Sequence, residues 1–330
     1  MQESRLLDLF CELVRIESPS FHEAPMAARC ADELRGLGFE VSFDDSAERV
    51  GSDTGNLVAH LPGTRAGHVV FSAHMDTVQP CAGIEPVVVD GVVRSAGDTI
   101  LSADDKAGVA AIFEGVRSAV ESGSPRPDVT VLLTTCEEQH LLGSSALADG
   151  LLPAGAPCYV LDADGAPGTI ITGAPCHWSL NATFSGRAAH EGVCPEEGVS
   201  AIAMAAAAVS SMPLGRLDEA TTANVGFIEG GGATNVVPDT CALAGECRSL
   251  YAERAEAQKA AMTEALEVAA ARFGGAVSIE WTKSYDAVLF DEEDELVQAI
   301  VRASRAAGLE PRFHRSGGGS DANVLAACGV

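Results

Sequence analysis

The chain has 330 residues and a formal charge of −26, with 21 Lys and Arg against 47 Asp and Glu. This surplus of acids argues against binding to nucleic acid or to an anionic membrane through a general positive field. The N-terminus lacks the basic region and unbroken apolar core of a signal peptide, and no run of about 20 apolar residues could span a bilayer. The ten cysteines are scattered without a CxxC pair, which favours reduced thiols and a cytoplasmic protein over a disulfide framework.

Helical spacing of apolar residues predicts two helices near the N-terminus, at about 6–14 and 26–37. Four short apolar runs follow, namely NLVAHL, HVVFSAHMD, TVLLTTCEE and CYVLDAD, with a helical pattern between the second and the third. Strands that alternate with helices predict an α/β layer, in which the chemistry gathers beyond the carboxyl ends of the strands.

The pattern changes at about Ala174. From there to about Tyr285 the chain gives strand, helix, strand, strand, helix and strand, which is the order of a ferredoxin-like α+β domain. A helical pattern like that of the first part then resumes. We therefore expect a catalytic α/β domain in two parts, 1–173 and 287–330, and an inserted lid domain at 174–286 that could supply a homodimer interface.

Acids and a histidine stand just beyond the apolar runs or open the next helix. His74 and Asp76 share one side of a strand, so the carboxylate can steady an imidazole that binds a metal. Asp104 stands at a helix start, where acids are also favoured by the helix dipole alone. Each set by itself fits a solvated loop or a strand end, but together they favour a metal site with oxygen and imidazole ligands. The four sets are His74 with Asp76, Asp104 with Asp105, Glu137 with Glu138, and Asp162 with Asp164.

Eight segments together resemble a known family. In chain order they are SAHMDTV, SADDKAG, CEEQHLLGS, YVLDADG, GRAAHEG, GGGATNVVPD, ECRSL and SGGGSDANV. They resemble the M20 zinc metallopeptidases and amidohydrolases, and within that family the peptidase T-like branch. The resemblance implies a mixed-sheet zinc-peptidase catalytic domain with an inserted ferredoxin-like lid domain. It also implies a hydrolase of peptide bonds in small peptides, of the tripeptide aminopeptidase kind.

The same resemblance implies two zinc ions per subunit, and Mn²⁺ or Co²⁺ could occupy the same ligands. His74, Asp104 and Asp162 would surround one ion. Glu138, a shared Asp104 and a C-terminal histidine would surround the other, so that Asp104 bridges the two. The LDADG segment leaves Asp162 and Asp164 as alternatives, and Asp162 is preferred because it directly ends the apolar YVL run.

The catalytic roles fall to residues beside these ligands. Neighbouring carboxylates at a strand end point in different directions, so Glu138 can bind metal while Glu137 acts as the base that takes a proton from water. Asp76 would support His74. The lid would contribute His190 to stabilise the tetrahedral oxyanion, and Asn235 and Arg248 to contact the substrate; the forked donors of Arg248 suit a carboxylate. A rival interpretation makes Cys136 a nucleophile, but a single thiol inside an apolar strand is more often inert.

The family pattern continues beyond SGGGSDANV to a last zinc-binding histidine, and no histidine follows His314 in this sequence. We therefore expect the sequence to be part of a longer protein, or to bind one metal tightly at most. Two alternatives to a small-peptide hydrolase stay open: an amidohydrolase that deacylates N-acyl amino acids, and a catalytically silent metal-binding relative. Glu137 and His190 favour an enzyme, because a binding module needs neither a base nor an oxyanion donor.

Overall fold

The computed structural model describes residues 2–163 and 165–329, so that Asp164, the alternative to Asp162, lies outside the described residues. The chain divides into two compact units. The first unit comprises Met1–Ile170, Gln298–Arg312 and Ser320–Val330, and the second comprises Ile171–Val297 and Phe313–Gly319. The domain boundaries expected from the sequence, 1–173, 174–286 and 287–330, stay a prediction.

The first unit is built on a mixed five-stranded sheet with the order β1-β2-β6-β3-β7. The pairs β3–β6 and β3–β7 are parallel, whereas β1–β2 and β2–β6 are antiparallel. The predicted mixed α/β class is therefore confirmed. The strands are β1 (Glu40–Phe43), β2 (Leu57–Leu61), β3 (His68–His74), β6 (Asp128–Thr134) and β7 (Cys158–Val160).

Parallel pairing brings the carboxyl ends of β3, β6 and β7 to the same edge of this sheet. His74 at the end of β3 pairs with Thr134 at the end of β6, and Val160 of β7 pairs with Ser72 of β3. The polar residues that follow these three strands in the sequence are therefore neighbours in space.

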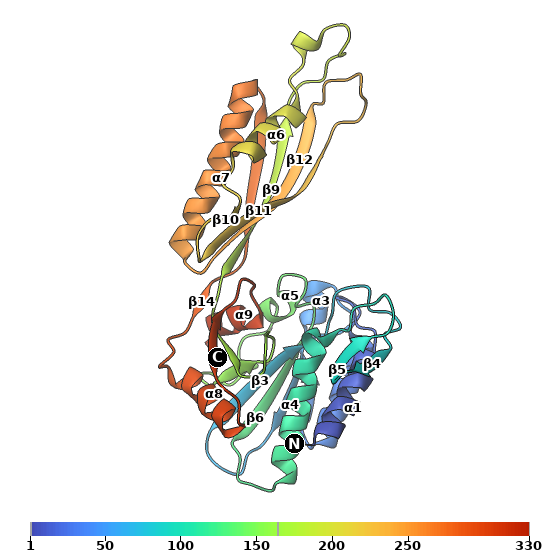
Figure 1. Cartoon of the computed structure of the whole chain (residues 1–330), viewed down its shortest axis with the longest axis vertical. Coiled ribbons are helices and arrows are strands. Elements are labelled where there is room, and N and C mark those ends of the chain that lie inside the picture. The colour runs from blue at the N-terminus through green and yellow to red at the C-terminus, as the bar shows by residue number, and fades with distance from the viewer. Residues whose placement is uncertain (1, 164, 330) are drawn as a thin grey trace. The chain divides into compact units, whose positions relative to one another are not determined.

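Helices bury the apolar positions of the sheet. The helical periodicity of α1 (Glu3–Val14), α2 (Ala24–Gly36) and α4 (Ala103–Glu121) places Leu13, Leu34 and Phe113 in one core with Leu57 and Leu133 of the sheet, all fully buried. Each such side chain contributes about 1.5–3 kcal/mol by leaving water. Figure 1 shows α1 and α4 side by side. The first unit also contains α3 (Ser46–Val50), α5 (Leu142–Ser145), α9 (Asp321–Ala327), most of α8 (Glu295–Ala306) and a hairpin of β4 (Pro86–Val89) and β5 (Val92–Ser95).

The second unit has the predicted ferredoxin-like order with one short extra strand, β10. Its sheet has the order β10-β11-β12-β9-β13, and all its pairings are antiparallel. The elements are β9 (Cys176–Ser185), η1 (Pro195–Glu197), α6 (Ala201–Ser211), β10 (Gly215–Arg216), β11 (Thr221–Gly230), β12 (Thr240–Ser249), α7 (Ala252–Phe273) and β13 (Ala276–Tyr285). A further small sheet has the order β14-β8-β15, formed by β14 (Val288–Leu289), β8 (Thr169–Ala174) and β15 (Arg312–Arg315).

Helices α6 and α7 cover one face of the sheet of the second unit. Leu243 and Cys247 of β12 are buried in the same core as Met204 of α6 and Leu266 of α7. Because side chains alternate along a strand, Glu246 and Arg248, which flank Cys247, lie on the opposite face of the sheet, which these helices do not cover. Within the described residues, none of the helices has both the length and the apolar composition needed to cross a membrane.

Candidate active site

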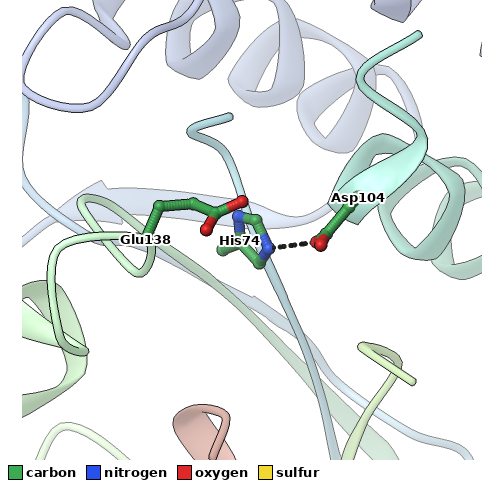
Figure 2. Close-up of side chains that lie close together, drawn as sticks. All are labelled: His74, Asp104 and Glu138. Carbon is green, nitrogen blue, oxygen red and sulfur yellow. Dashed lines mark hydrogen bonds and ion pairs between the residues drawn. The ribbon is translucent and has the colours of Figure 1, made fainter. Parts of the chain in front are cut away.

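His74 occupies the centre of the polar edge in the first unit. Its side chain is 1% exposed, and Nδ1 lies 2.9 Å from the backbone oxygen of Asp76 and 3.4 Å from its carboxylate. Nε2 lies 2.8 Å from Oδ1 of Asp104, whose side chain is 70% exposed. Figure 2 shows Asp104 and Glu138 on either side of the imidazole.

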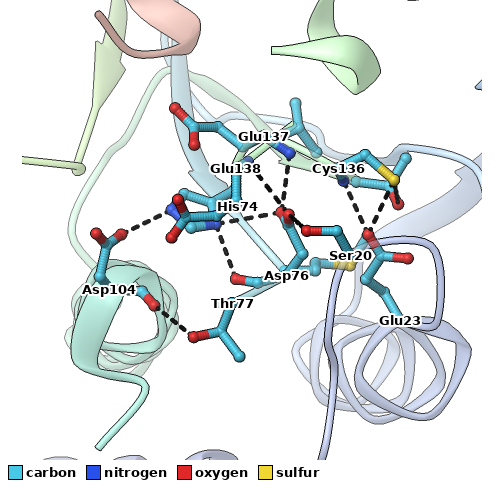
Figure 3. A network of polar contacts seen from close by, with 12 residues as sticks. Ser20, Glu23, His74, Asp76, Thr77, Asp104, Cys136, Glu137 and Glu138 are labelled. Atoms are coloured by element: carbon cyan, nitrogen blue, oxygen red, sulfur yellow. Dashed lines mark hydrogen bonds and ion pairs between the residues drawn. The ribbon is translucent and has the colours of Figure 1, made fainter. Parts of the chain in front are cut away.

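Asp76 connects the histidine to the glutamate pair. Its Oδ1 accepts a hydrogen bond from the backbone N–H of Glu137 at 2.9 Å, and its Oδ2 accepts one from the N–H of Glu138 at 3.2 Å and one from the hydroxyl of Ser20 at 2.7 Å. Figure 3 shows these contacts meeting on one carboxylate. A single buried carboxylate thus fixes both the imidazole and the turn that carries the two glutamates.

A second buried carboxylate, Glu23 at the start of α2, holds the residue before that pair. It accepts hydrogen bonds from the backbone N–H of Cys136 at 2.8 Å and from its Sγ at 3.3 Å. Cys136 has a positive φ of 51°, a conformation that an L-residue keeps only when its surroundings enforce it. Burial raises the pKa of this thiol to about 12, which disfavours the thiolate that a nucleophile needs at neutral pH.

Two groups of side chains in the described part of the chain have the composition of a metal site. His74, Asp104 and Glu138 form one group, and His74, Asp105 and Asp162 form the other. Within each group the potential ligand atoms lie within 4.8 Å of one another. One imidazole and several carboxylates match the ligand preferences of zinc and related divalent ions.

The electrostatics of the edge also fit a bound cation. Burial, then repulsion from Asp321, raises the pKa of Glu137 to about 9. Burial likewise raises the pKa of Glu138, and that of Asp162 to about 6. Burial disfavours a charged His74, but hydrogen bonds to Asp104 and Asp76 outweigh it and raise its pKa well above the usual value. The carboxylates thus favour a positively charged His74. A divalent ion bound among the same carboxylates would supply positive charge in place of that proton.

Comparison with known proteins identifies the family. Residues 173–273 match the family model of the peptidase dimerisation domain, and residues 56–168 match that of peptidase family M28. The uncharacterised protein YqjE of Bacillus subtilis is 42% identical over 331 residues, which cover 100% of this chain and 89% of that one. The crystal structure of aminopeptidase PepT from Bacillus cereus is 42% identical with a TM-score of 0.92, and covers 100% of this chain and 89% of its own. A tripeptidase structure from Staphylococcus aureus is 36% identical with a TM-score of 0.95, with 100% and 88% covered.

The chain belongs to the M20 family of peptidases. It is a metallopeptidase of the peptidase T-like branch, and the resemblance of its motifs to that branch is confirmed. A more distant M20 structure, from Bacillus subtilis, is described as a dinuclear metal-binding peptidase. M20 and M28 peptidases are generally dinuclear metal-dependent enzymes, and the His74 groups give this chain its candidate metal site.

In this M20 peptidase the sequence-predicted residues fall into three places. His74, Asp76, Asp104, Glu137, Glu138 and Asp162 lie together at the polar edge of the first unit. His190 and Asn235 are neighbours in the second unit, since the N–H of Glu191 donates to the carbonyl of Asn235 at 3.0 Å and His190 pairs with Val236. Arg248 lies near the other end of that unit's sheet, paired in register with His177. The role assigned to each residue stays a prediction.

Three further residues contact or join the site, although their sequence patterns did not assign them a part in it. Asp105 belongs to the candidate set Asp104–Asp105 but was given no ligand role of its own, yet it is 4% exposed and grouped with Asp162. Asp321 lies in the SGGGSD segment, which did carry the family resemblance; it is buried, and its Oδ2 accepts the hydroxyl of Thr134 at 2.5 Å. Glu23 has no motif around it. Only its burial and its bonds to Cys136 reveal it.

Removing bound metal from this peptidase should lower its melting temperature by several degrees. Glu137 is buried and Glu138 and Asp162 are partly buried beside it, and a bound cation offsets their repulsion while stabilising the folded state by mass action. Thermal unfolding with and without a chelator measures the effect, and a refill with Zn²⁺ should restore it. An unchanged melting temperature in a sample from which the chelator demonstrably removed metal would contradict the assignment.

Proposed function

We propose that this M20 peptidase removes the N-terminal residue from small peptides such as tripeptides, with Glu137 as the catalytic base. The proposal is carried by the turn at residues 136–138, in which Asp76 fixes Glu137 and Glu138 through their backbone N–H groups. Likeness over the whole chain to structures described as an aminopeptidase and a tripeptidase supports the substrate class.

The metal ligands of the proposal are His74, Asp104, Glu138 and Asp162, with Asp104 shared between two ions. Zn²⁺ is the proposed metal, and Mn²⁺ or Co²⁺ suits the same ligands. When bound, such ions lower the pKa of water and polarise the carbonyl group of the substrate. Asp105 is the alternative partner of Asp162, because these two carboxylates and His74 form one of the two ligand groups.

Glu137 supplies the proton transfer. It lies next to the ligand Glu138, is absent from both ligand groups, and is held by Asp76, so its carboxylate remains available for water. It takes a proton from the attacking water and delivers that proton to the departing amine, which contributes about 10²–10⁴ in rate.

His190 is the proposed donor to the oxyanion. Its Nδ1 accepts the backbone N–H of Gly192 at 3.2 Å, and a neutral imidazole that accepts at Nδ1 carries its proton on Nε2. Nε2 then donates to the negative oxygen of the tetrahedral state. Asn235 is the proposed second contact to substrate in this region, and Arg248 is the proposed receptor of the substrate α-carboxylate.

We further propose a homodimer formed through the second unit, in the cytoplasm, with no nucleic-acid or membrane partner. The match to a peptidase dimerisation domain supports self-association. Phe227 and Ile228 of β11 support an interface there, because they are 51% and 52% exposed on a strand that pairs with β10 only at residues 222 and 223. All ten cysteines are free thiols, as suits a reducing compartment.

A substrate panel tests the proposed function. The metal-loaded protein should cleave tripeptides with a free amino group and act at least about tenfold more slowly on the same peptides acetylated at the N-terminus, since a site built around a polar group discriminates against its loss. Faster hydrolysis of N-acyl amino acids would favour the deacylase alternative. If the parent protein turns over every substrate of the panel no faster than Glu137→Gln does, the result would favour a catalytically silent metal-binding relative.

A further inference from the structure

Four polar side chains form a continuous chain of contacts at one end of the sheet in the second unit. They come from three adjacent strands: Ser284 from β13, His177 from β9, and Glu246 and Arg248 from β12. Ser284 Oγ lies 2.8 Å from His177 Nδ1, and His177 Nε2 lies 2.9 Å from Glu246 Oε2. The chain ends on Arg248, which donates to Glu246.

Arg248 is bound to Glu246 along one side only. Its Nε donates to Oε1 at 3.0 Å and its Nη2 to Oε2 at 3.1 Å, a two-pronged contact that fixes the plane of the guanidinium. Among the described residues, Nη1 has no hydrogen-bond acceptor. The side chain is 28% exposed. A partly buried guanidinium with one uncommitted edge is suited to receive an external carboxylate.

Glu246 is itself fixed and charged. The hydrogen bond from His177, with that from Arg248, outweighs burial and lowers the pKa of Glu246 to about 2, so this carboxylate is ionised throughout the neutral range. His177 is 1% exposed and stacks on Tyr285, with ring centroids 5.6 Å apart. The carboxylate that binds Arg248 is therefore itself held in place, unlike the partner in a pair of mobile surface side chains.

A glycine run of the same unit lies against this cluster. A Cβ on Gly319 would stand 2.4 Å from the ring of Tyr285, so the backbone can approach the ring only because residue 319 has no side chain. A Cβ on Gly318 would stand 4.0 Å from Arg248 Nη1, so at this point the loop passes close to the uncommitted edge without a side chain that could cover it.

We propose that Glu246 is the positioning residue of Arg248 and that, with His177 and Ser284 behind it, it presents the Nη1 edge to the α-carboxylate of the peptide. The inference rests on the proposed function, in which Arg248 receives that carboxylate. Fixing the guanidinium before the substrate arrives reduces the rotamer entropy lost on binding, so the effect belongs to substrate affinity and not to the proton transfers.

The test compares each tripeptide with its C-terminal amide, which lacks the carboxylate. Glu246→Gln should raise KM for the free acid about tenfold and leave kcat and the amide kinetics within about twofold, because one charge-assisted contact is weakened. Glu280→Gln, an exposed glutamate of β13 in the same sheet, is the matched control and should behave like the parent protein. Unchanged amide kinetics also report that Glu246→Gln is folded.

Arg248→Ala separates this inference from the proposed function. It should remove most of the preference for acid over amide. If Arg248→Ala changes both substrates equally, Arg248 is not the carboxylate receptor and that part of the proposed function fails. If Arg248→Ala removes the preference but Glu246→Gln retains it, the positioning role of Glu246 is overturned. An equal loss on acid and amide in Glu246→Gln would assign Glu246 a purely structural role and overturn the inference as well.

Discussion

Replacing Glu137 by Gln should lower kcat at least about a hundredfold, because the amide cannot accept the proton that the carboxylate takes from water. Metal content should stay nearly intact, since Glu137 belongs to neither of the two ligand groups. Its position should also be kept, because Asp76 holds it through the backbone N–H, which the substitution leaves in place. Single-turnover rates and metal analysis on the same sample measure both halves of this expectation.

Glu40→Gln is the matched control for that experiment. Glu40 is an exposed residue of β1, at the outer edge of the same sheet, and its replacement should change neither kcat nor metal content. Activity of Glu137→Gln within a few-fold of the parent protein would show that another group accepts the proton. Loss of metal together with activity would make Glu137 a ligand instead of the base.

Replacing Asp104 by Ala should abolish activity and release the metal bound at both proposed sites together. Asp104 is the proposed shared ligand, and its Oδ1 lies 2.8 Å from His74 Nε2 within the group that also contains Glu138. Without Asp104, one proposed ligand set keeps only His74 and Asp162 and the other keeps only Glu138, whereas a zinc site normally has at least about three protein donors. Metal analysis after dialysis, with calorimetric titration by Zn²⁺, measures the stoichiometry.

Two further variants accompany Asp104→Ala: Asp98→Ala is the control, and Asp105→Asn tests whether Asp105 is the bridging ligand instead. Asp98 is an exposed acid of the preceding loop, and its replacement should leave the metal content unchanged. Asp105 is buried and grouped with Asp162, so Asp105→Asn should weaken one ion at most. Release of both ions by Asp105→Asn, with retention by Asp104→Ala, would transfer the bridging role to Asp105. Release of one ion by Asp104→Ala would show that it does not bridge.

The sequence was most informative where strand and motif coincide. Strand β3 is a short apolar run that ends in His74, and β6 is one that is followed closely by the Glu137–Glu138 pair; parallel pairing brings these strand ends together. The ferredoxin-like order of the second unit followed from the alternation of period-two and helical patterns. The hairpin β4–β5 and strand β1 were not predicted, because four-residue strands give too short a periodic signal.

Residues that act through long-range contacts could not be predicted. Glu23 contacts Cys136 across a sequence separation of 113, and Asp321 contacts Thr134 across 187. Both are isolated acids within their segments, so burial alone distinguishes them from solvated ones. Similarly, adjacent positions in the sequence do not reveal that Asp104 is exposed while Asp105 is buried; that difference arises from how α4 begins.

The ten-residue length of β9 determines how far apart Arg248 and His190 lie in the second unit. Arg248 pairs with His177 near its first residue, whereas His190 follows its last, so the two are separated by roughly 30 Å of extended strand. An extended tripeptide spans only about 10 Å. One copy of the unit therefore cannot offer Arg248 and His190 to the same tripeptide, however the unit moves as a body. If both groups act in one turnover, each active centre is assembled from two copies of the chain, and dilution that separates the copies silences both centres at once.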